Sequence, residues 1–133
     1  MRQHRGAELE ARYEVAVENY STKINIEAET AASLARTMLL PAAVRHLNEL
    51  IASGREGLID EFAPIIAGFH EAIVELEQAN DDPGLEGMDL AVHFRDTVIP
   101  AMTAVRDCAD RLERLVADDL WPLPKYMEIL FIK

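Results

Sequence analysis

The stretch Ile24–Leu50, INIEAETAASLARTMLLPAAVRHLNEL, is the longest helical pattern in the chain and carries one proline, Pro41, in its middle. Between Ala7 and Ser53 the chain has no glycine and no second proline. A helix of about 45 residues spans about 65 Å, because each residue adds 1.5 Å. This stretch therefore sets the length of the fold, and we expect the other helices to pack along it.

A first helix over about residues 7–52 is predicted from apolar residues that recur every three or four positions. They are Leu9, Tyr13, Val17, Tyr20, Ile24, Ala28, Ala31, Leu34 or Ala35, Met38 and Ala42, followed by Val44, Leu47 and Ile51. Pro41 has no amide hydrogen, and its ring clashes with the carbonyl four residues earlier. Because the pattern resumes after Pro41, we expect a kink there rather than an end. Gly54 is expected to cap the helix.

Two further helices are predicted over about residues 57–79 and 88–118, joined by a loop at 80–87 with the sequence NDDPGLEG. The second carries one amphipathic stripe, which comprises Leu58, Phe62, Ile65, Phe69, Ile73 and Leu76. Pro64 fits if the regular helix starts near Asp60 or Glu61, or if the helix is kinked there. The sequence leaves both possibilities open.

Pro100 lies within the third helical pattern, as Pro41 lies within the first. The sequence RTMLLPA at residues 36–42 is echoed by RDTVIPA at 95–101, 59 positions later. The echo has two explanations, namely a relic of duplication and two independently kinked helices.

The C-terminal segment 120–133, LWPLPKYMEILFIK, differs from the helices. Its two prolines disfavour a helix and favour an extended run. The dense apolar end predicts a docking tail that folds back on the bundle or docks on another domain or subunit. The whole sequence predicts a single all-α domain over 1–133, an elongated antiparallel bundle of about three long helices, two of them proline-kinked, with an extended C-terminal tail.

The composition restricts the partners. The net charge is −11, and residues 55–87 hold one basic residue against nine acidic ones. This balance disfavours nucleic acid and anionic membrane as partners, and it suits a solvated face or a docking surface for a basic partner. No apolar run approaches the ~20 residues that cross a bilayer. The single cysteine fits a reducing, cytoplasmic location.

Motifs for chemistry are lacking. A di-iron helical bundle uses Glu-x-x-His pairs, but the residue three before each of His46, His70 and His93 is Ala or Leu. One cysteine and no HExxH motif argue against zinc. Cys108 lies near an apolar helix face, so we expect a buried thiol rather than a nucleophile. We therefore predict no catalytic, cofactor-binding or metal-binding residue in this segment.

Two separate stretches resemble a known family. Residues 12–14 (RYE), 18–20 (ENY), 24–28 (INIEA) and 41–42 (PA) look like the start of the C-terminal region of type III glutamine synthetases. Residues 121–131, WPLPKYMEILF, are similar to the way those enzymes end. The structural and family-motif residues that we single out are Tyr13, Glu27, Pro41, Pro100, Trp121, Pro122, Pro124, Tyr126 and Phe131.

The resemblance implies a parent enzyme that joins glutamate and ammonia at the expense of ATP, with divalent metal such as Mg²⁺. In that family the metal, nucleotide and glutamate ligands lie in the preceding catalytic domain, and type III enzymes form large ring-shaped assemblies. This segment would be a non-catalytic helical domain that packs on the catalytic domain of the same chain and on neighbouring subunits, and supports oligomer assembly. The alternatives are a stand-alone helical adaptor with an acidic face and a small-molecule regulatory bundle, for which the sequence shows no convergent polar pocket.

Overall fold

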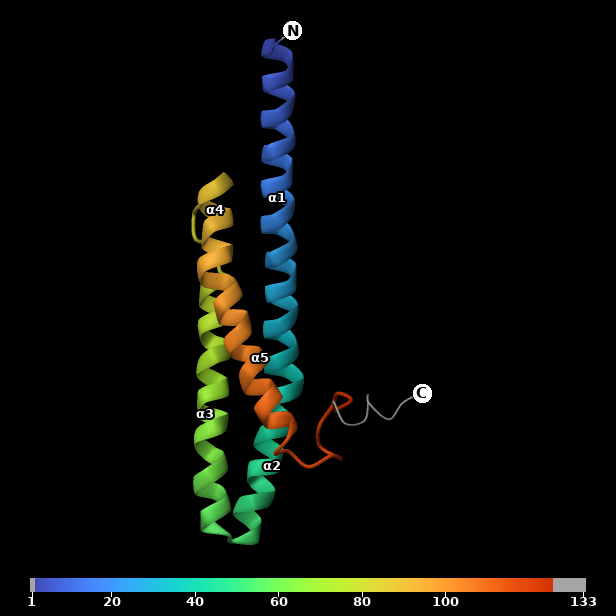
Figure 1. Ribbon diagram of the computed structural model, residues 1–133. Coiled ribbons are helices and arrows are strands. Elements are labelled where there is room, and N and C mark those ends of the chain that lie inside the picture. The colour runs from blue at the N-terminus through green and yellow to red at the C-terminus, as the bar shows by residue number, and fades with distance from the viewer. Residues whose placement is uncertain (1, 126–133) are drawn as a thin grey trace.

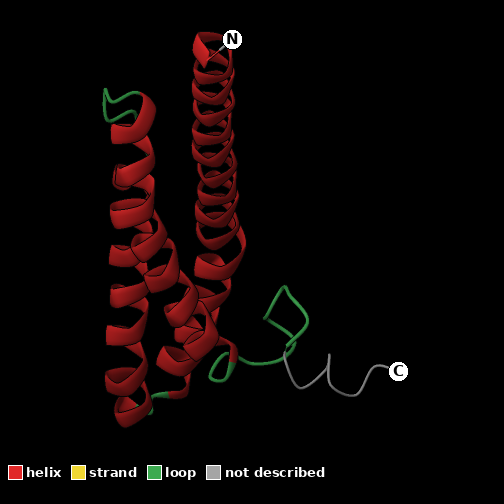
Figure 2. Cartoon of the chain, turned by 45° about the horizontal axis from the view of Figure 1, so that its top comes forward, coloured by secondary structure: helices red, strands yellow, loops and turns green. Residues whose placement is uncertain are grey.

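The computed structural model describes residues 2–125 of the chain, with side chains from residue 6 onward. Within residues 2–125 every regular element is a helix. Three long rods lie side by side, each antiparallel to the one before it (Figure 1). The loops lie at the rod ends and in the C-terminal segment (Figure 2). The predicted all-α, elongated antiparallel bundle is confirmed.

The first and third rods are each built from two α-helices joined by a π-helical segment. The first contains α1 (Arg2–Leu34), the π-helical segment η1 (Ala35–Leu39) and α2 (Leu40–Ser53); the second is α3 (Glu56–Ala79); the third contains α4 (Gly87–His93), the π-helical segment η2 (Phe94–Val98) and α5 (Ile99–Glu113). Among the residues that the structure describes, no helix is long and apolar enough to cross a membrane.

Pro41 and Pro100 each lie two positions after the end of a π-helical segment. Pro41 is the second residue of α2, and Pro100 is the second residue of α5. The residue before each proline donates its amide five positions back, from Leu40 to Ala35 and from Ile99 to Phe94. The π turn therefore lies immediately before the position at which the proline has no amide hydrogen to donate. The α-helical geometry is interrupted as expected, whereas the bend of the helix axis stays a prediction.

The π turn in η1 changes which residues of the first rod face the core. The α-helical spacing predicted Met38, Val44 and Ile51 on the apolar face, but all three are exposed. Leu39 and Ala43 are buried, as is the predicted Ala42. Because a π turn holds one residue more than an α turn, the buried stripe extends by about one position, from Ala42 to Ala43. The predicted stripe is therefore wrong at Met38, Val44 and Ile51.

The α2–α3 turn follows from Gly54, whose φ of 72° lies in the left-handed region that glycine adopts without strain. Its amide donates to the carbonyl of Ile51 at 3.1 Å and closes α2. The next helix begins at Glu56, so Pro64 lies inside α3 and not in its first turn. Of the two possibilities that the sequence left open, the later start near Asp60 is wrong.

The third rod ends earlier than the predicted residue 118. The last residue of α5 is Glu113, and the chain turns because the carbonyl of Leu112 accepts the amides of both Leu115 and Val116. Such shared bonds tighten the end of a helix. Val116 is thereby buried against the bundle.

Small residues on the first rod allow the core to close. Ala28, Ala35 and Ala43 are at most 1% exposed, and they lie opposite the larger side chains of the other two rods. The largest fully buried side chains are Phe69, Ile73, Leu76, Leu112 and Val98. Alanine lets helix axes approach closely, so a core with few aromatic residues still fills the space between three rods.

Candidate functional site

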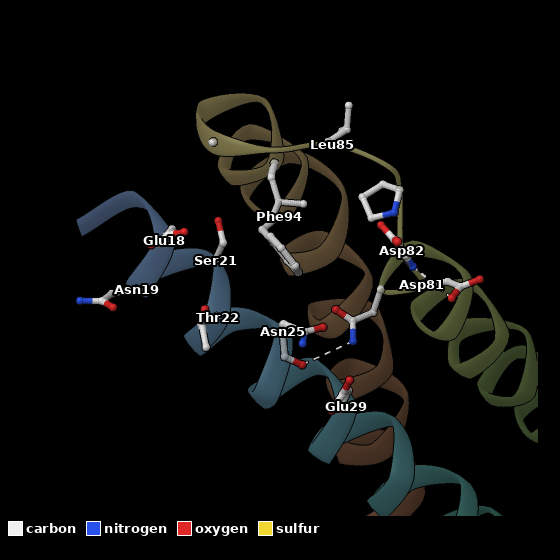
Figure 3. A pocket seen from close by; sticks show the side chains of 14 residues that line it. Glu18, Asn19, Ser21, Thr22, Asn25, Glu29, Asp81, Asp82, Leu85 and Phe94 are labelled. Carbon is white, nitrogen blue, oxygen red and sulfur yellow. Dashed lines mark hydrogen bonds between the residues drawn. The ribbon is translucent and has the colours of Figure 1, made fainter. Parts of the chain in front are cut away.

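A groove of about 670 Å³ lies between α1 and the loop that joins α3 to α4. About three turns of α1, from Glu18 to Glu29, and residues of the loop 80–87 supply most of its lining, and Leu90 and Phe94 of the third rod close one side. Figure 3 shows α1 on one side of this space and the loop on the other. Four carboxylates line it, those of Glu18, Glu29, Asp81 and Asp82. We call this cavity the acidic groove.

The loop side of the acidic groove is held by short-range hydrogen bonds. Asp82 accepts the amide of Gly84 at 2.9 Å, and Asp81 accepts the amide of Asp82 at 3.0 Å. Gly84 has a φ of 69°, which suits glycine at the end of this turn. The side-chain nitrogen of Asn80 donates to the carbonyl of Asn25 at 3.4 Å (Figure 3). This bond ties the C-terminus of α3 to α1 and sets the width of the groove.

Two polar atoms in the groove wall have no hydrogen-bond partner among the described residues. Ser21 is 5% exposed, and its Oγ is unpaired. The Oδ1 of Asn80 is also buried and unpaired. Buried polar groups are nearly always hydrogen-bonded, and an unpaired one costs about 1–3 kcal/mol. The pair therefore marks the acidic groove as a place where a hydrogen-bonding ligand would gain energy.

A second groove of about 710 Å³ adjoins the first, between α1 and residues 85–90. It lies where α1 runs past the end of the other two rods (Figure 1). Leu9, Tyr13, Leu85 and Met88 are 66%, 57%, 40% and 46% exposed. The hydroxyl of Tyr13 lies 4.0 Å from the sulfur of Met88. We call these four residues the N-terminal apolar face.

The residues singled out from the sequence do not converge on one site. Tyr13 and Glu27 are exposed on α1, Pro41 and Pro100 follow the two π segments, and Pro122 and Pro124 are exposed on either side of a half-buried leucine. Tyr126 and Phe131 lie outside the described residues.

Trp121 is 9% exposed and belongs to the main core. Its amide donates to the carbonyl of Ala117 at 3.2 Å. Lys125 donates to the carbonyl of Val116 and also pairs with Asp118, each at 2.6 Å. The tail up to residue 125 is thus attached to the end of α5, while the prediction for residues 126–133 stays untested.

His46, His93 and Cys108 have structural surroundings. His46 Nδ1 accepts the amide of Ala117 at 3.2 Å, and its ring lies 4.8 Å from that of Phe62. His93 Nε2 donates to the carbonyl of Ala79 at 2.7 Å. Partial burial and the nearby Asp107 raise the pKa of Cys108, which keeps it a thiol at neutral pH. Within residues 6–125 no cluster of three or more His, Cys, Asp or Glu side chains could hold a metal ion.

Comparison with known proteins shows that this chain is similar to one family. The family model described as the glutamine synthetase C-terminal domain matches residues 4–56, which cover the whole first rod from the fourth residue onward. The glutamine synthetase of Bacteroides fragilis is 29% identical over 95% of this chain, and that of Butyrivibrio fibrisolvens is 27% identical over 93%. The chain spans 20% of the length of each of these two relatives.

The chain is therefore a helical domain related to the C-terminal domain of the glutamine synthetases. Its relatives include the type-3 glutamine synthetase of Dictyostelium discoideum, which is 30% identical over 95% of this chain. This chain covers 20% of the length of that enzyme. The resemblance stated from residues 12–42 and 121–131 is confirmed.

The sequence alone did not predict the acidic groove. Residues 80–82 were read as part of a loop, and Glu18, Ser21 and Glu29 as positions on a long helix. Only the return of the chain at the α3–α4 loop brings the two sets together, although they are more than 50 positions apart. The adjacent Asn-Asp-Asp run was the available signal, but it is equally typical of an ordinary turn.

Proposed function

We propose that this chain is the non-catalytic C-terminal helical domain of a glutamine synthetase, an ATP-dependent glutamate–ammonia ligase of nitrogen assimilation. The observation that carries the proposal is the match of 95% of this chain to 20% of a type-3 enzyme. ATP and a divalent metal would be bound by the catalytic domain, which acts in the cytoplasm. The comparisons do not favour the stand-alone adaptor.

In this proposal the domain packs on the catalytic domain and supports oligomer assembly through the N-terminal apolar face. Leu9 and Tyr13 are more than half exposed, and they lie in the N-terminal part of α1. An exposed apolar group of this kind is favourable only when a partner covers it. Tyrosine is also enriched in protein interfaces, where its ring is covered and its hydroxyl finds a polar partner.

The test replaces both side chains in the full-length enzyme, as Leu9→Ser/Tyr13→Ser. Because these side chains contribute little to the core of the bundle, the domain should stay helical while the enzyme loses oligomer mass in light scattering and loses specific activity. Val44→Ser/Ile51→Ser is the matched control, since those side chains are 40% and 53% exposed at the other end of the first rod. Unchanged mass and activity for the first variant, or equal loss for both, would contradict the proposal.

A further inference from the structure

The acidic groove has the features of a site for a cationic ligand. Its ionisable lining side chains are all carboxylates, two from α1 and two from the α3–α4 loop. Such a lining attracts a cation and repels an anion. The C-terminus of α3 also lies at this groove, and a helix C-terminus carries a partial negative charge.

The unpaired atoms in the wall can accept hydrogen bonds from the N–H groups of a ligand. Asn80 Oδ1 can only accept a hydrogen bond, and Ser21 Oγ can accept one as well. Figure 3 shows the hydroxyl of Ser21 directed away from the α1 backbone, toward the side where Phe94 lies. A rotation about one side-chain bond is enough to turn it toward a bound group. An ammonium group satisfies both the charge and the hydrogen-bonding requirement.

The spacing of the carboxylates favours an extended ligand over a compact ion. Glu18 and Glu29 are eleven residues apart on α1, which corresponds to about 16 Å. A divalent metal needs several oxygen ligands around one point, and no such cluster occurs among the side chains of residues 6–125. Pro83, Leu85 and Phe94 supply apolar lining to the same groove. A groove that offers both carboxylates and apolar side chains matches a chain of ammonium groups joined by methylene segments.

We propose that the acidic groove binds a linear alkyl polyamine, with its terminal ammonium groups paired to carboxylates on α1 and on the loop. Its methylene segments lie against the apolar lining, and its N–H groups give partners to Ser21 and Asn80. The site does not depend on the proposed role in glutamine synthetase, because its residues all belong to this chain. Since the carboxylates are exposed, binding weakens as the salt concentration rises.

Isothermal titration calorimetry of the chain with spermine at low ionic strength tests the proposal. We expect one site, and Glu29→Gln/Asp81→Asn should weaken binding about five- to tenfold, since two exposed ion pairs are lost. The control Glu49→Gln/Glu61→Gln removes the same charge from exposed positions near the α2–α3 turn, and it should change the affinity less than about twofold. Asn and Gln keep the oxygen acceptors, so the loop turn stays closed.

Ser21→Ala distinguishes a defined binding site from nonspecific attraction to an acidic surface. Without a ligand it should raise the melting temperature, because it removes an unpaired buried hydroxyl. It should nevertheless weaken spermine binding about threefold, the usual loss for one hydrogen bond.

The remaining outcomes overturn the proposal. They are the absence of spermine binding, equal losses in the groove variant and its control, and unchanged affinity in Ser21→Ala. An oligolysine peptide tests the other source of alkylammonium groups. If it bound in the groove while spermine did not, the site would be a protein-docking surface instead. Backbone chemical-shift mapping on the unmodified chain shows whether spermine or oligolysine binds in the groove, and it does not rely on any variant.

Discussion

Arg36 joins the first rod to the second through a forked ion pair with Glu77. Its Nε donates to one carboxylate oxygen at 2.8 Å, and its Nη2 donates to the other. The hydrogen bond from Arg36 lowers the pKa of Glu77, against a smaller opposing effect of desolvation. Both side chains are more than a third exposed, so solvent screens the pair. The pair therefore contributes little energy but a definite pH dependence.

The first prediction concerns that pH dependence. Because the folded state lowers the pKa of Glu77, its contribution is present above the unfolded glutamate pKa and is lost as the pH falls through the folded value. Glu77→Gln should therefore slightly lower the free energy of unfolding at neutral pH and leave it unchanged in acid. Urea denaturation at several pH values measures this. In an Arg36→Gln background the effect of Glu77→Gln should vanish, and an equal effect in both backgrounds would refute the assignment.

At the scale of elements, a π segment precedes two of the three prolines that lie within the rods, whereas Pro64 lies inside α3 without one. Each π segment carries an extra residue and ends two positions before its proline, and the two segments lie 59 positions apart, the same spacing as the echoed sequences. In η1 the extra residue also decides which side chains face the core, because Leu39 is buried and Met38 is exposed. The π turn is thus part of the packing and not only a consequence of the proline.

The second prediction tests the extra residue. Deleting Met38 together with Pro41→Ala should convert η1 into regular α-helix and keep the flanking stripes in register, since a π turn holds one residue more than an α turn. We expect a cooperative fold that loses no more than about 1–2 kcal/mol, by analogy with modest core adjustments.

Deletion of Glu71, an exposed residue in the middle of α3, is the matched control for that variant. It turns the following half of α3 by about 100°, since 3.6 residues make one turn, and should prevent stable folding. Circular dichroism during thermal unfolding compares the two deletions. If both unfold the chain alike, the extra residue in η1 is not what sets the register.

At the scale of the whole molecule, the three rods differ in length, and α1 extends past the other two at its N-terminal end (Figure 1). Residues 6–16 are exposed throughout, whereas α3 buries Phe62, Phe69, Ile73 and Leu76. A helical segment without tertiary packing is only marginally stable in water. Stability is therefore unevenly distributed along the first rod.

The third prediction follows from this distribution. In the isolated chain, the backbone amides of residues 6–16 should exchange with deuterium at least about a hundredfold faster than those of residues 62–76, because local opening of an unpacked helix costs far less free energy than global unfolding. Hydrogen-exchange mass spectrometry measures both regions in one experiment. Equal protection of the two regions at low protein concentration would contradict the uneven distribution. Protection of 6–16 that grows with concentration would show that a second copy covers this segment.

The helices themselves could be predicted because their signals are local. Apolar spacing placed the three rods, and Gly54 and the residues 80–84 marked the two turns between them. The predictions failed where backbone geometry departs from the regular α-helix. The register after η1 depends on a π turn, and the end of α5 depends on the carbonyl of Leu112 accepting two amides.

The sequence by itself determined the helical class, the approximate placement of the three rods and the resemblance to a family, because hydrophobic period, turn residues and motif order are properties of neighbouring positions. Only the tertiary structure decided where Glu18 and Ser21 meet Asp81, and that the core-facing stripe of α1 runs on into the exposed Leu9 and Tyr13. The physical reason is that a groove or an uncovered face depends on where rods of unequal length end relative to one another. Packing sets that alignment, and no short-range pattern encodes it.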